Sequence, residues 1–181
     1  MDLLSETAQK TKQAFIESFC LINKTKPIPQ ISIQEVSRKA GYNRSTFYQY
    51  FQNIYDLVEY IENDLLQSVL EKKKHIRPNN THDFIYSIID SYHENELCID
   101  ALLGKYGSEH FMNMLKEQIK INVLEESIDD SNPIKSYLVE FRVSSSLSIF
   151  RHWIKQSKNI SIEELVKLIT TLYQNGVSGI I

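Results

Sequence analysis

The stretch from Arg44 to Tyr50 has hydrogen-bonding side chains at six of its seven positions, with Phe47 as the exception. Guanidinium, hydroxyl and amide groups bind phosphate oxygens and the edges of bases, so this stretch suits contact with a nucleic acid. The alternative is an ordinary helical hairpin with a polar outer face, because short motifs also arise by chance. The six residues are Arg44, Ser45, Thr46, Tyr48, Gln49 and Tyr50.

Two short helices and a tight turn are predicted to position these side chains. Ser32 and Glu35 have the three-residue spacing of a capping box, which predicts that a helix begins at Ile33. This helix is expected to run to Ala40. Gly41 then ends it, because glycine adopts the left-handed conformation without steric cost.

A second helix is predicted from Arg44 to about Tyr50, with Asn43 as its N-cap. Two helices joined in this way have the layout of a helix-turn-helix, whose second helix enters the major groove of DNA. One face of such a pair is buried while the other meets phosphates and bases. The apolar residues available for the buried face are Val36, Ala40, Phe47 and Phe51.

The stretch from Ser32 to Phe51 resembles the N-terminal signature of the TetR/AcrR family of one-component repressors. The family's pattern, T-[VI]-x-x-[IV]-[AS]-x-x-A-G-[VY]-[SN]-[RK]-x-T-[FL]-Y-x-[HY]-F, is matched over about twenty consecutive positions. The resemblance implies an all-α protein with an N-terminal three-helix helix-turn-helix domain and a C-terminal helical domain for ligand binding and dimerisation. The matching residues are Ser32, Ile33, Val36, Ser37, Ala40, Gly41, Tyr42, Asn43, Arg44, Thr46, Phe47, Tyr48, Tyr50 and Phe51.

The resemblance also assigns expected DNA contacts. Phosphate contacts fix the register of a protein on DNA, whereas contacts with base edges read the sequence. Arg44 is expected to read guanine and Gln49 adenine, each through two hydrogen bonds. Gln34 is expected to reach a base or a phosphate. The phosphate-binding positions are Ser32, Thr46, Tyr48 and Tyr50, the positions that vary with the operator are Arg44, Ser45 and Gln49, and Asn43 completes the predicted DNA-binding set.

Two positions leave alternatives open. The ring of Tyr48 can instead pack against the first helix, with or without its hydroxyl on DNA. Ile54 stands where the family commonly has a lysine that meets a phosphate, so this contact is expected to be missing. Backbone amides at the start of that helix, or the side chain of Asn53, can partly replace it.

The charge distribution supports contact with DNA through one end of the protein. The 181-residue chain has a net charge of −3, which taken whole argues against a nucleic-acid partner. Residues 1–50, however, hold seven Lys and Arg against four Asp and Glu, whereas residues 51–181 hold thirteen against nineteen. A basic first part on an acidic remainder fits a DNA-binding head on a body that does not touch DNA.

The composition, with 42% hydrophobic and 24% charged residues, is typical of a soluble globular protein. No stretch reads as a signal peptide or as an apolar run long enough to cross a bilayer, which predicts a cytoplasmic protein without a membrane partner. Cys20 and Cys98 are most simply reduced core residues.

About nine helices are expected, and no strand pattern competes with them. The domain boundary is placed near Asn53, which gives a DNA-binding domain, 1–53, and an effector-binding and dimerisation domain, 54–181. The segment 77–80 is the clearest linker and is counted as internal to the second domain. The expected helices span residues 1–23, 33–40, 44–50, 54–74, 81–94, 97–103, 108–125, 133–156 and 162 to about 176.

The last two expected helices carry long apolar stripes. In the resembled family they form a four-helix bundle with their copies in a second subunit, which predicts a homodimer. The alternative is that the stripes pack only within one subunit. The serines between positions 144 and 148 either allow close helix packing or line a pocket. The predicted interface residues are Leu138, Phe141, Phe150, Ile154, Leu165, Leu168, Leu172 and Tyr173.

The end of the chain, from Phe150 to Leu165, resembles the C-terminal domain common in Firmicutes members of the family. Such a domain is expected to hold a ligand pocket. Aromatic and methionine side chains at helical spacing can equally be plain core. The pocket candidates are Tyr86, Tyr92, His93, Tyr106, Phe111, Met112 and Trp153.

A few acidic and histidine residues superficially suggest an acid–base or metal site, but no catalytic or nucleotide-binding motif accompanies them. His93 and Glu94 are neighbours and so point different ways on a helix. Solvated surface residues explain the set better, and neither catalysis nor a metal or other cofactor is predicted. The residues are His93, Glu94, Glu96, Glu109 and His110.

The predicted function is that of a sequence-specific transcriptional regulator that binds double-stranded operator DNA as a homodimer. By resemblance, it is expected to be a repressor released from its operator by a small-molecule effector. The alternative is a regulator of the same fold that a partner protein controls.

Overall fold

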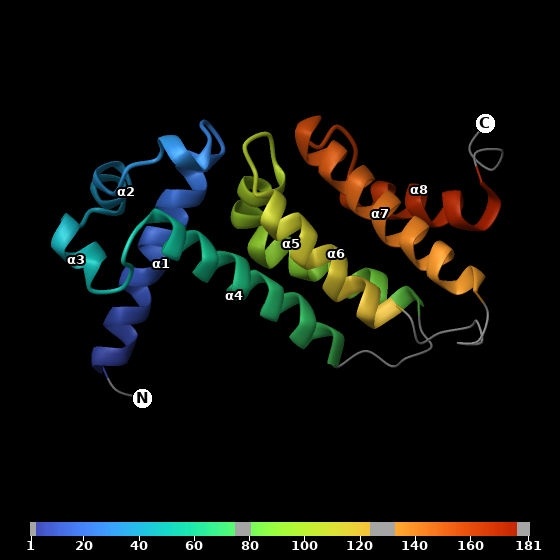
Figure 1. Cartoon of the computed structure of the whole chain (residues 1–181), viewed down its shortest axis with the longest axis horizontal. Coiled ribbons are helices and arrows are strands. Elements are labelled where there is room, and N and C mark those ends of the chain that lie inside the picture. Colours follow the sequence, from blue (N-terminus) through green and yellow to red (C-terminus); the bar gives the residue numbers. More distant parts are fainter. Residues whose placement is uncertain (1–2, 75–80, 124–132, 177–181) are drawn as a thin grey trace. The chain divides into compact units, whose positions relative to one another are not determined.

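The computed structural model describes residues 3–74, 81–123 and 133–176, which Figure 1 draws in colour. Over these residues the chain is helical and has no strand, which confirms the predicted all-α class. The predicted linker 77–80 lies outside the described residues. The elements are α1 (Leu3–Asn23), the 3₁₀ helix η1 (Ile28–Gln30), α2 (Ile33–Ala40), α3 (Arg44–Tyr48), α4 (Ile54–Lys74), α5 (Thr81–Leu103), α6 (Glu109–Val123), α7 (Ile134–Lys155) and α8 (Ile162–Asn175).

The described residues form eight α-helices, where about nine were expected. The expected helices 81–94 and 97–103 are parts of one element, α5. Only Asn95 departs from helical geometry within it, with φ −119° and ψ 17°. No glycine or proline separates the two parts, so the chain bends at Asn95 without ending the helix.

The end of α3 also differs from the prediction, because the helix stops at Tyr48 rather than at Tyr50. The amide of Gln49 donates to the carbonyl of Thr46 at 3.2 Å, and the amide of Tyr50 donates to the carbonyl of Phe47 at 3.0 Å. These bonds span three residues instead of four, so the last turn is tighter than an α-helix but continues its path.

The chain forms two compact units, and each is described by itself. The first comprises Met1–Ser68 and Asn95–Ser108, and the second comprises Val69–Glu94 and Glu109–Ile181. These units are defined by contacts, whereas the predicted domains 1–53 and 54–181 divide the chain by role. The division by role remains a prediction.

Phe15 of α1 is the centre of the core of the first unit. Its side chain is 0% exposed, and its ring meets that of Phe47 edge to face, with 5.3 Å between the centroids. The rings of Tyr42 at 5.5 Å and Phe51 at 6.5 Å lie around it. Aromatic pairs in this geometry stabilise beyond the area they bury. α1 is therefore the platform against which α2 packs and on which Phe47 of α3 is buried. Figure 1 shows the course of these three helices.

The core of the second unit is built around Tyr92 and Trp153, whose buried rings are 5.3 Å apart. The indole Nε1 of Trp153 donates to the carbonyl of Ile160 at 2.8 Å, which ties the end of α7 to the loop before α8. α8 then begins with a capping box, in which Ser161 and Glu164 cap each other. Local hydrogen bonds thus fix the direction in which α8 leaves α7.

Phe15→Ala is expected to destabilise the protein by about 3–5 kcal/mol, because it removes a buried ring and leaves a cavity. Leu21→Ala is the matched control, since Leu21 lies on the same helix and is 45% exposed. The control is expected to cost about 0.5 kcal/mol or less. Urea unfolding followed by circular dichroism measures both changes, and equal losses would contradict the central position of Phe15.

Candidate nucleic-acid interface

The geometry of α2, the turn and α3 is set by local sequence. Ser32 and Glu35 form the predicted capping box, in which the Ser32 hydroxyl accepts from the Glu35 amide at 3.2 Å. Gly41 ends α2 in the left-handed region, with φ 78°, as predicted. The amide of Tyr42 donates to the carbonyl of Ser37 at 2.9 Å and closes the turn. A non-glycine residue at position 41 would be strained by this φ.

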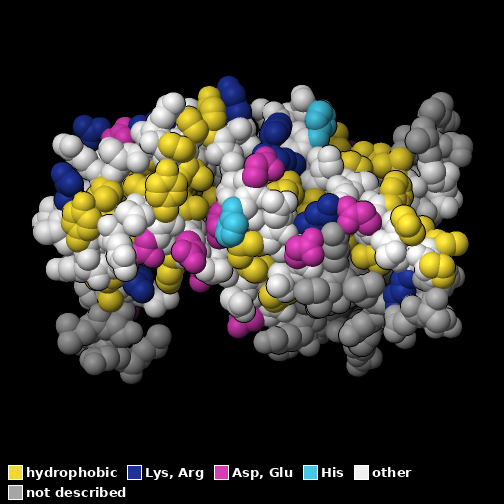
Figure 2. All heavy atoms as spheres, viewed as in Figure 1, with side chains coloured by type: hydrophobic (Ala, Val, Ile, Leu, Met, Phe, Trp, Pro, Cys, Tyr) yellow, Lys and Arg dark blue, Asp and Glu magenta, His cyan; other side chains and the backbone are white. Residues whose placement is uncertain are grey.

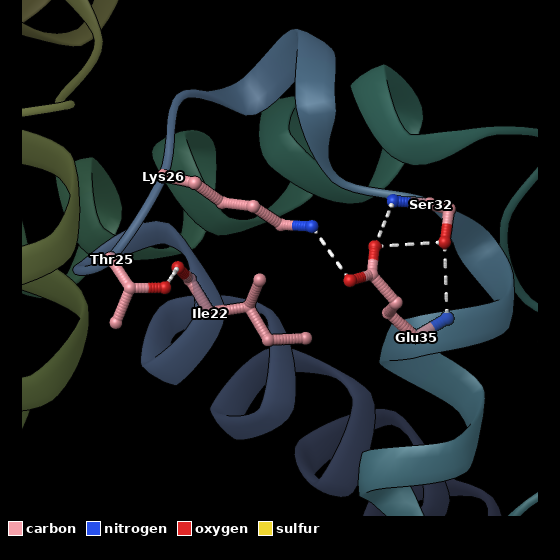
Figure 3. A network of polar contacts seen from close by, with 5 residues as sticks. All are labelled: Ile22, Thr25, Lys26, Ser32 and Glu35. Atoms are coloured by element: carbon pink, nitrogen blue, oxygen red, sulfur yellow. Dashed lines mark hydrogen bonds and ion pairs between the residues drawn. The ribbon is translucent and has the colours of Figure 1, made fainter.

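A lysine that no sequence motif indicated supports the capping box (Figure 3). Lys26 Nζ lies 2.6 Å from one carboxylate oxygen of Glu35, and the other oxygen accepts from the hydroxyl and the amide of Ser32 at 2.9 and 3.1 Å. The hydrogen bond from Lys26, followed by those from Ser32, lowers the pKa of Glu35 from 4.5 to about 2. The chain between α1 and α2 is thereby tied to the first turn of α2.

Asn43 organises the first turn of α3. Its Oδ1 accepts from the amide of Thr46 at 2.8 Å, from the hydroxyl of Ser45 at 2.6 Å and from the hydroxyl of Thr46 at 2.9 Å. Asn43 is therefore the N-cap that the sequence indicated. The two hydroxyls that were expected to face DNA are donors to this cap, so either one can donate to a phosphate only by leaving Asn43.

Arg44 and Tyr48 form a pair one helical turn apart. Arg44 Nη2 donates to the Tyr48 hydroxyl at 3.3 Å, and Tyr48 is 50% exposed. Because the hydroxyl accepts from the guanidinium, its own proton is available to an acceptor such as a phosphate oxygen. The Tyr48 ring lies beside the Phe47 ring, with 6.0 Å between their centroids. The Tyr50 ring lies beside the ring of Phe15 on α1, with 6.4 Å between their centroids.

Lys12 of α1 places a positive charge beside Tyr50. Its Nζ lies 6.0 Å from the centroid of the Tyr50 ring and 5.1 Å from that of Tyr60, within the range of cation–π interactions. Lys12 precedes Phe15 by three residues, and this spacing places both on one side of a helix. The sequence therefore contained a signal for Lys12, which adds a cation beside a predicted phosphate contact.

Gln34 and Gln49 are exposed, at the second position of α2 and directly after α3. Each amide offers donors and an acceptor, as base edges require. The structure thus brings the nine predicted DNA-contacting residues onto the start of α2, the cap of α3, and α3 with its final turn. Their contacts with DNA remain predictions.

The start of α4 offers less to a phosphate than expected. Ile54 is buried, with 7% exposure. Asn53 Oδ1 accepts from the amides of Tyr55 and Asp56 at 2.8 and 3.1 Å. The carboxylate of Asp56 accepts from the amide of Gln52 at 2.7 Å. The Asn53 cap thus occupies two of the amides that were expected to replace the missing lysine.

The predicted dimer residues fall into three groups by exposure. On α7, Leu138 and Phe141 are exposed by 39% and 60%, and the neighbouring Tyr137, which the prediction omitted, by 76%. Figure 2 shows hydrophobic side chains gathered over the α7–α8 end of the face in view. Leu165, in contrast, is 2% exposed, so it packs within the subunit. The half-buried candidates are Phe150, Ile154, Leu168, Leu172 and Tyr173.

A shallow apolar hollow lies between α7 and α8. The hydroxyl of Tyr173 bonds with those of Ser145, at 3.1 Å, and Ser146. The same hydroxyl donates to the carbonyl of Arg142. These two serines therefore hold α8 on α7. The residues that line the hollow are Phe141, Ser145, Ile149, Ile169, Leu172, Tyr173 and Gly176.

The predicted ligand-pocket residues have different surroundings in the structure. Tyr92, Phe111 and Trp153 are buried in the core of the second unit, whereas His93 is exposed and Met112 is half-buried. Tyr106 belongs to the first unit, and the side chain of Tyr86 lies outside the described residues. A role for these seven residues in binding a ligand remains a prediction.

Two families match the chain. Residues 24–61 match the family described as bacterial regulatory proteins, tetR family, and residues 79–175 match the transcriptional regulator C-terminal region. With the capped helix-turn-helix geometry, these matches define a DNA-binding transcriptional regulator with a helical C-terminal region. The chain belongs to the TetR family.

Solved structures share the fold over almost the whole chain. A TetR transcriptional regulator from Streptococcus agalactiae 2603V has a TM-score of 0.69 and 22% identity, over 94% of this chain and 97% of that chain. The dihydroxyacetone kinase operon activator DhaS has a TM-score of 0.64 and 20% identity, over 93% of this chain and 96% of that chain. No curated protein matches the sequence.

One of the residues that resembled an acid–base or metal site, Glu109, has an ion-pair partner. Glu109 pairs with Arg151 at 2.5 Å, and this hydrogen bond lowers the pKa of Glu109. Among the described residues, no group of three or more His, Cys, Asp and Glu is placed to hold a metal ion. Nor does any described helix have the length and apolarity to cross a membrane. Regulators of the TetR family are generally transcription factors rather than enzymes.

Glu35→Gln is expected to lower the thermal stability near neutral pH but not near pH 2. Because the folded-state pKa of Glu35 is lowered from 4.5 to about 2, the stabilisation by its charge is present above about pH 4.5. It is lost as the pH falls toward 2. Thermal unfolding of both proteins from about pH 6 to about pH 3 should therefore give Tm values that converge as the pH falls.

Two further variants test the source of this effect. Lys26→Met is expected to reduce the pH-dependent difference, because it removes the largest cause of the lowered pKa. Glu6→Gln is the control, since Glu6 pairs with Lys10 at 2.8 Å in a solvent-exposed pair, which contributes little. A Glu35→Gln difference that stays constant over the whole pH range would contradict the role given to the Glu35 charge.

Proposed function

We propose that this protein is a transcriptional repressor that binds operator DNA as a homodimer and leaves it when an effector binds the helical domain 54–181. The exposed face of α3 carries the proposal. Arg44 and Tyr48 are exposed on α3, and the buried side chain of Phe47 anchors this helix in the core. An outward cation and hydroxyl suit the phosphate and base contacts of a major-groove helix. The role places the protein in the cytoplasm and requires no catalysis.

Dimerisation is proposed through α7 and α8. Phe141 and Tyr137 are exposed by 60% and 76% on α7, and contiguous apolar patches of this kind mark interfaces. A second copy of the chain is the proposed occupant, because a pseudo-palindromic operator needs two heads related by a two-fold axis.

The sign of regulation has a second candidate. DhaS, which shares the fold, is named as an operon activator, so activation is the alternative to repression. A reporter under the regulator's own upstream DNA, in cells with and without the regulator gene, separates the two. Loss of the gene raises reporter output for a repressor and lowers it for an activator.

Effector control is proposed as a shift between two arrangements of the heads, only one of which fits both half-sites. A small molecule is the first candidate, and a partner protein is the second. Titration of the protein–DNA complex with metabolites, beside a pull-down with the purified protein, distinguishes them. Release by a metabolite supports the first candidate, and release only by a co-purified protein supports the second.

The experiment that tests the proposal first is a gel shift with the DNA upstream of the protein's own gene, titrated with salt. Salt-sensitive binding to a short pseudo-palindrome is expected, because phosphate contacts release counterions. Binding that shows no preference among sequences, or no binding at low salt, would contradict an operator at this position.

Tyr48→Phe and Arg44→Ala are expected to weaken operator binding in different ways. Loss of the Tyr48 hydroxyl removes a phosphate contact of about 1 kcal/mol, which weakens binding to all operator variants alike. Its salt slope should stay unchanged, because the hydroxyl carries no charge. Arg44→Ala should cost about 1–3 kcal/mol and relax the preference at one base pair.

Fluorescence anisotropy with a set of single-base operator variants measures both effects. Tyr106→Phe is the control, since it removes a tyrosine hydroxyl of the first unit outside α2 and α3. Equal losses on every operator variant for Arg44→Ala would refute its role in reading a base.

Phe141→Glu is expected to convert the dimer into a monomer and to weaken operator binding. The substitution places a charge in a proposed apolar interface, where a buried unpaired carboxylate costs several kcal/mol. Lys155→Glu is the control, because it changes an exposed position at the far end of the same helix. Sedimentation velocity measures the oligomeric state, and an unchanged dimer for Phe141→Glu would exclude this part of α7 from the interface.

A further inference from the structure

The two cysteines of the chain meet in the first compact unit. Cys20 lies on α1 and Cys98 lies on α5 beyond the bend at Asn95, and their Sγ atoms are 2.8 Å apart. This separation is only about 0.8 Å longer than a disulfide bond. No motif indicated the pair, because 78 positions separate the two residues.

Two polar contacts hold the two elements together just beyond the pair, C-terminal to each cysteine. Lys24 Nζ lies 3.1 Å from Asp100 Oδ2, and the Asp100 side chain is 3% exposed. The side chain of Asn23, which is fully buried, donates to the carbonyl of Tyr106 at 3.2 Å. α1 and the segment 95–108 are therefore fixed to each other close to the sulfurs.

We propose that Cys20 and Cys98 form a dithiol that hydroperoxides oxidise to an intramolecular disulfide. The half-buried Cys98 reacts first. Its sulfur attacks one oxygen of hydrogen peroxide, the O–O bond breaks, the other oxygen departs as water, and Cys98 becomes a sulfenic acid. The sulfur of Cys20 then attacks the sulfur of Cys98, the S–O bond breaks, and a second water leaves. Two thiols lose two electrons and two protons, and one hydrogen peroxide becomes two waters.

The surroundings of Cys20 agree with this order of events. The hydrogen bond with Cys98 and burial raise the pKa of the Cys20 thiol, so Cys20 stays protonated and does not compete for the oxidant. Its fully buried position also keeps the oxidant away. Because its sulfur lies 2.8 Å from that of Cys98, Cys20 is the residue placed to attack the sulfenic acid, and its proton leaves in the water that this attack releases.

The disulfide would join α1, which supports the helix-turn-helix, to the segment 95–108. This consequence does not depend on the proposed repressor function, because it concerns only the covalent state of the first unit. Hydrogen exchange at the end of α1 and in residues 95–108 should slow in the oxidised protein, since the link prevents their separation.

The experiment treats the reduced full chain with hydrogen peroxide and counts thiols after denaturation. Both thiols are expected to disappear, and peptide mapping without reduction should find the Cys20 and Cys98 peptides joined, with the loss of two hydrogen masses. Dithiothreitol should restore both thiols. Two intact thiols, links only between chains, or a sulfinic acid at Cys98 beside a free Cys20 would each overturn the proposal.

Two variants test the assigned order. In Cys20→Ser, Cys98 should stop at the sulfenic acid, which dimedone traps, and in Cys98→Ser the thiol of Cys20 should remain titratable. Circular dichroism establishes that each variant folds. If Cys20→Ser does not fold, dimedone added to the wild-type protein during oxidation should trap Cys98 in competition with Cys20. Trapping at Cys20 instead would overturn the order.

Discussion

The packing of Phe47 against Phe15 is the interaction on which the rest of the DNA-binding head depends. α3 has five residues and α2 has eight, and isolated helices of this length are not stable in water. They persist because the ring of Phe47 is buried on α1, 5.3 Å from that of Phe15. Burying this one side chain turns the polar positions of α3 outward, so the core contact and the orientation of the candidate interface have the same cause.

Helix capping and DNA contact make competing demands on the same side chains. Asn43 stabilises α3 by accepting three hydrogen bonds, two of them from the hydroxyls of Ser45 and Thr46. Those hydroxyls are restrained before DNA arrives, which lowers the entropy lost on binding but requires an exchange of hydrogen bonds. Arg44 and Tyr48 need no such exchange of hydrogen bonds. Their mutual bond uses one guanidinium N–H and an acceptor site of the hydroxyl, so the tyrosine proton and the other guanidinium N–H groups are available to DNA.

Features encoded within four residues could be predicted, and features that depend on distant partners could not. The capping box of Ser32 and Glu35 could be predicted because both partners lie in one turn. The role of Lys26 was not, because its partner lies nine residues away across two prolines. The bend at Asn95 was misread as a helix end, since local polarity favours a break and only tertiary packing decides between break and bend. For the DNA contacts, the sequence indicated which positions are exposed. It did not predict the hydrogen bonds that these side chains make with one another in the free protein, which only the structure shows.

The bend at Asn95 coincides with a boundary between the two units. The chain crosses between them after Ser68, at Asn95 and after Ser108, and the first two crossings lie inside α4 and α5. Asn95 Nδ2 donates to Ser68 Oγ at 3.2 Å, so the two helices are joined where each changes unit. Asn95 lies outside helical geometry, so α5 changes direction at this residue. The segment of the first unit that follows the bend carries Cys98, whose partner Cys20 lies on α1.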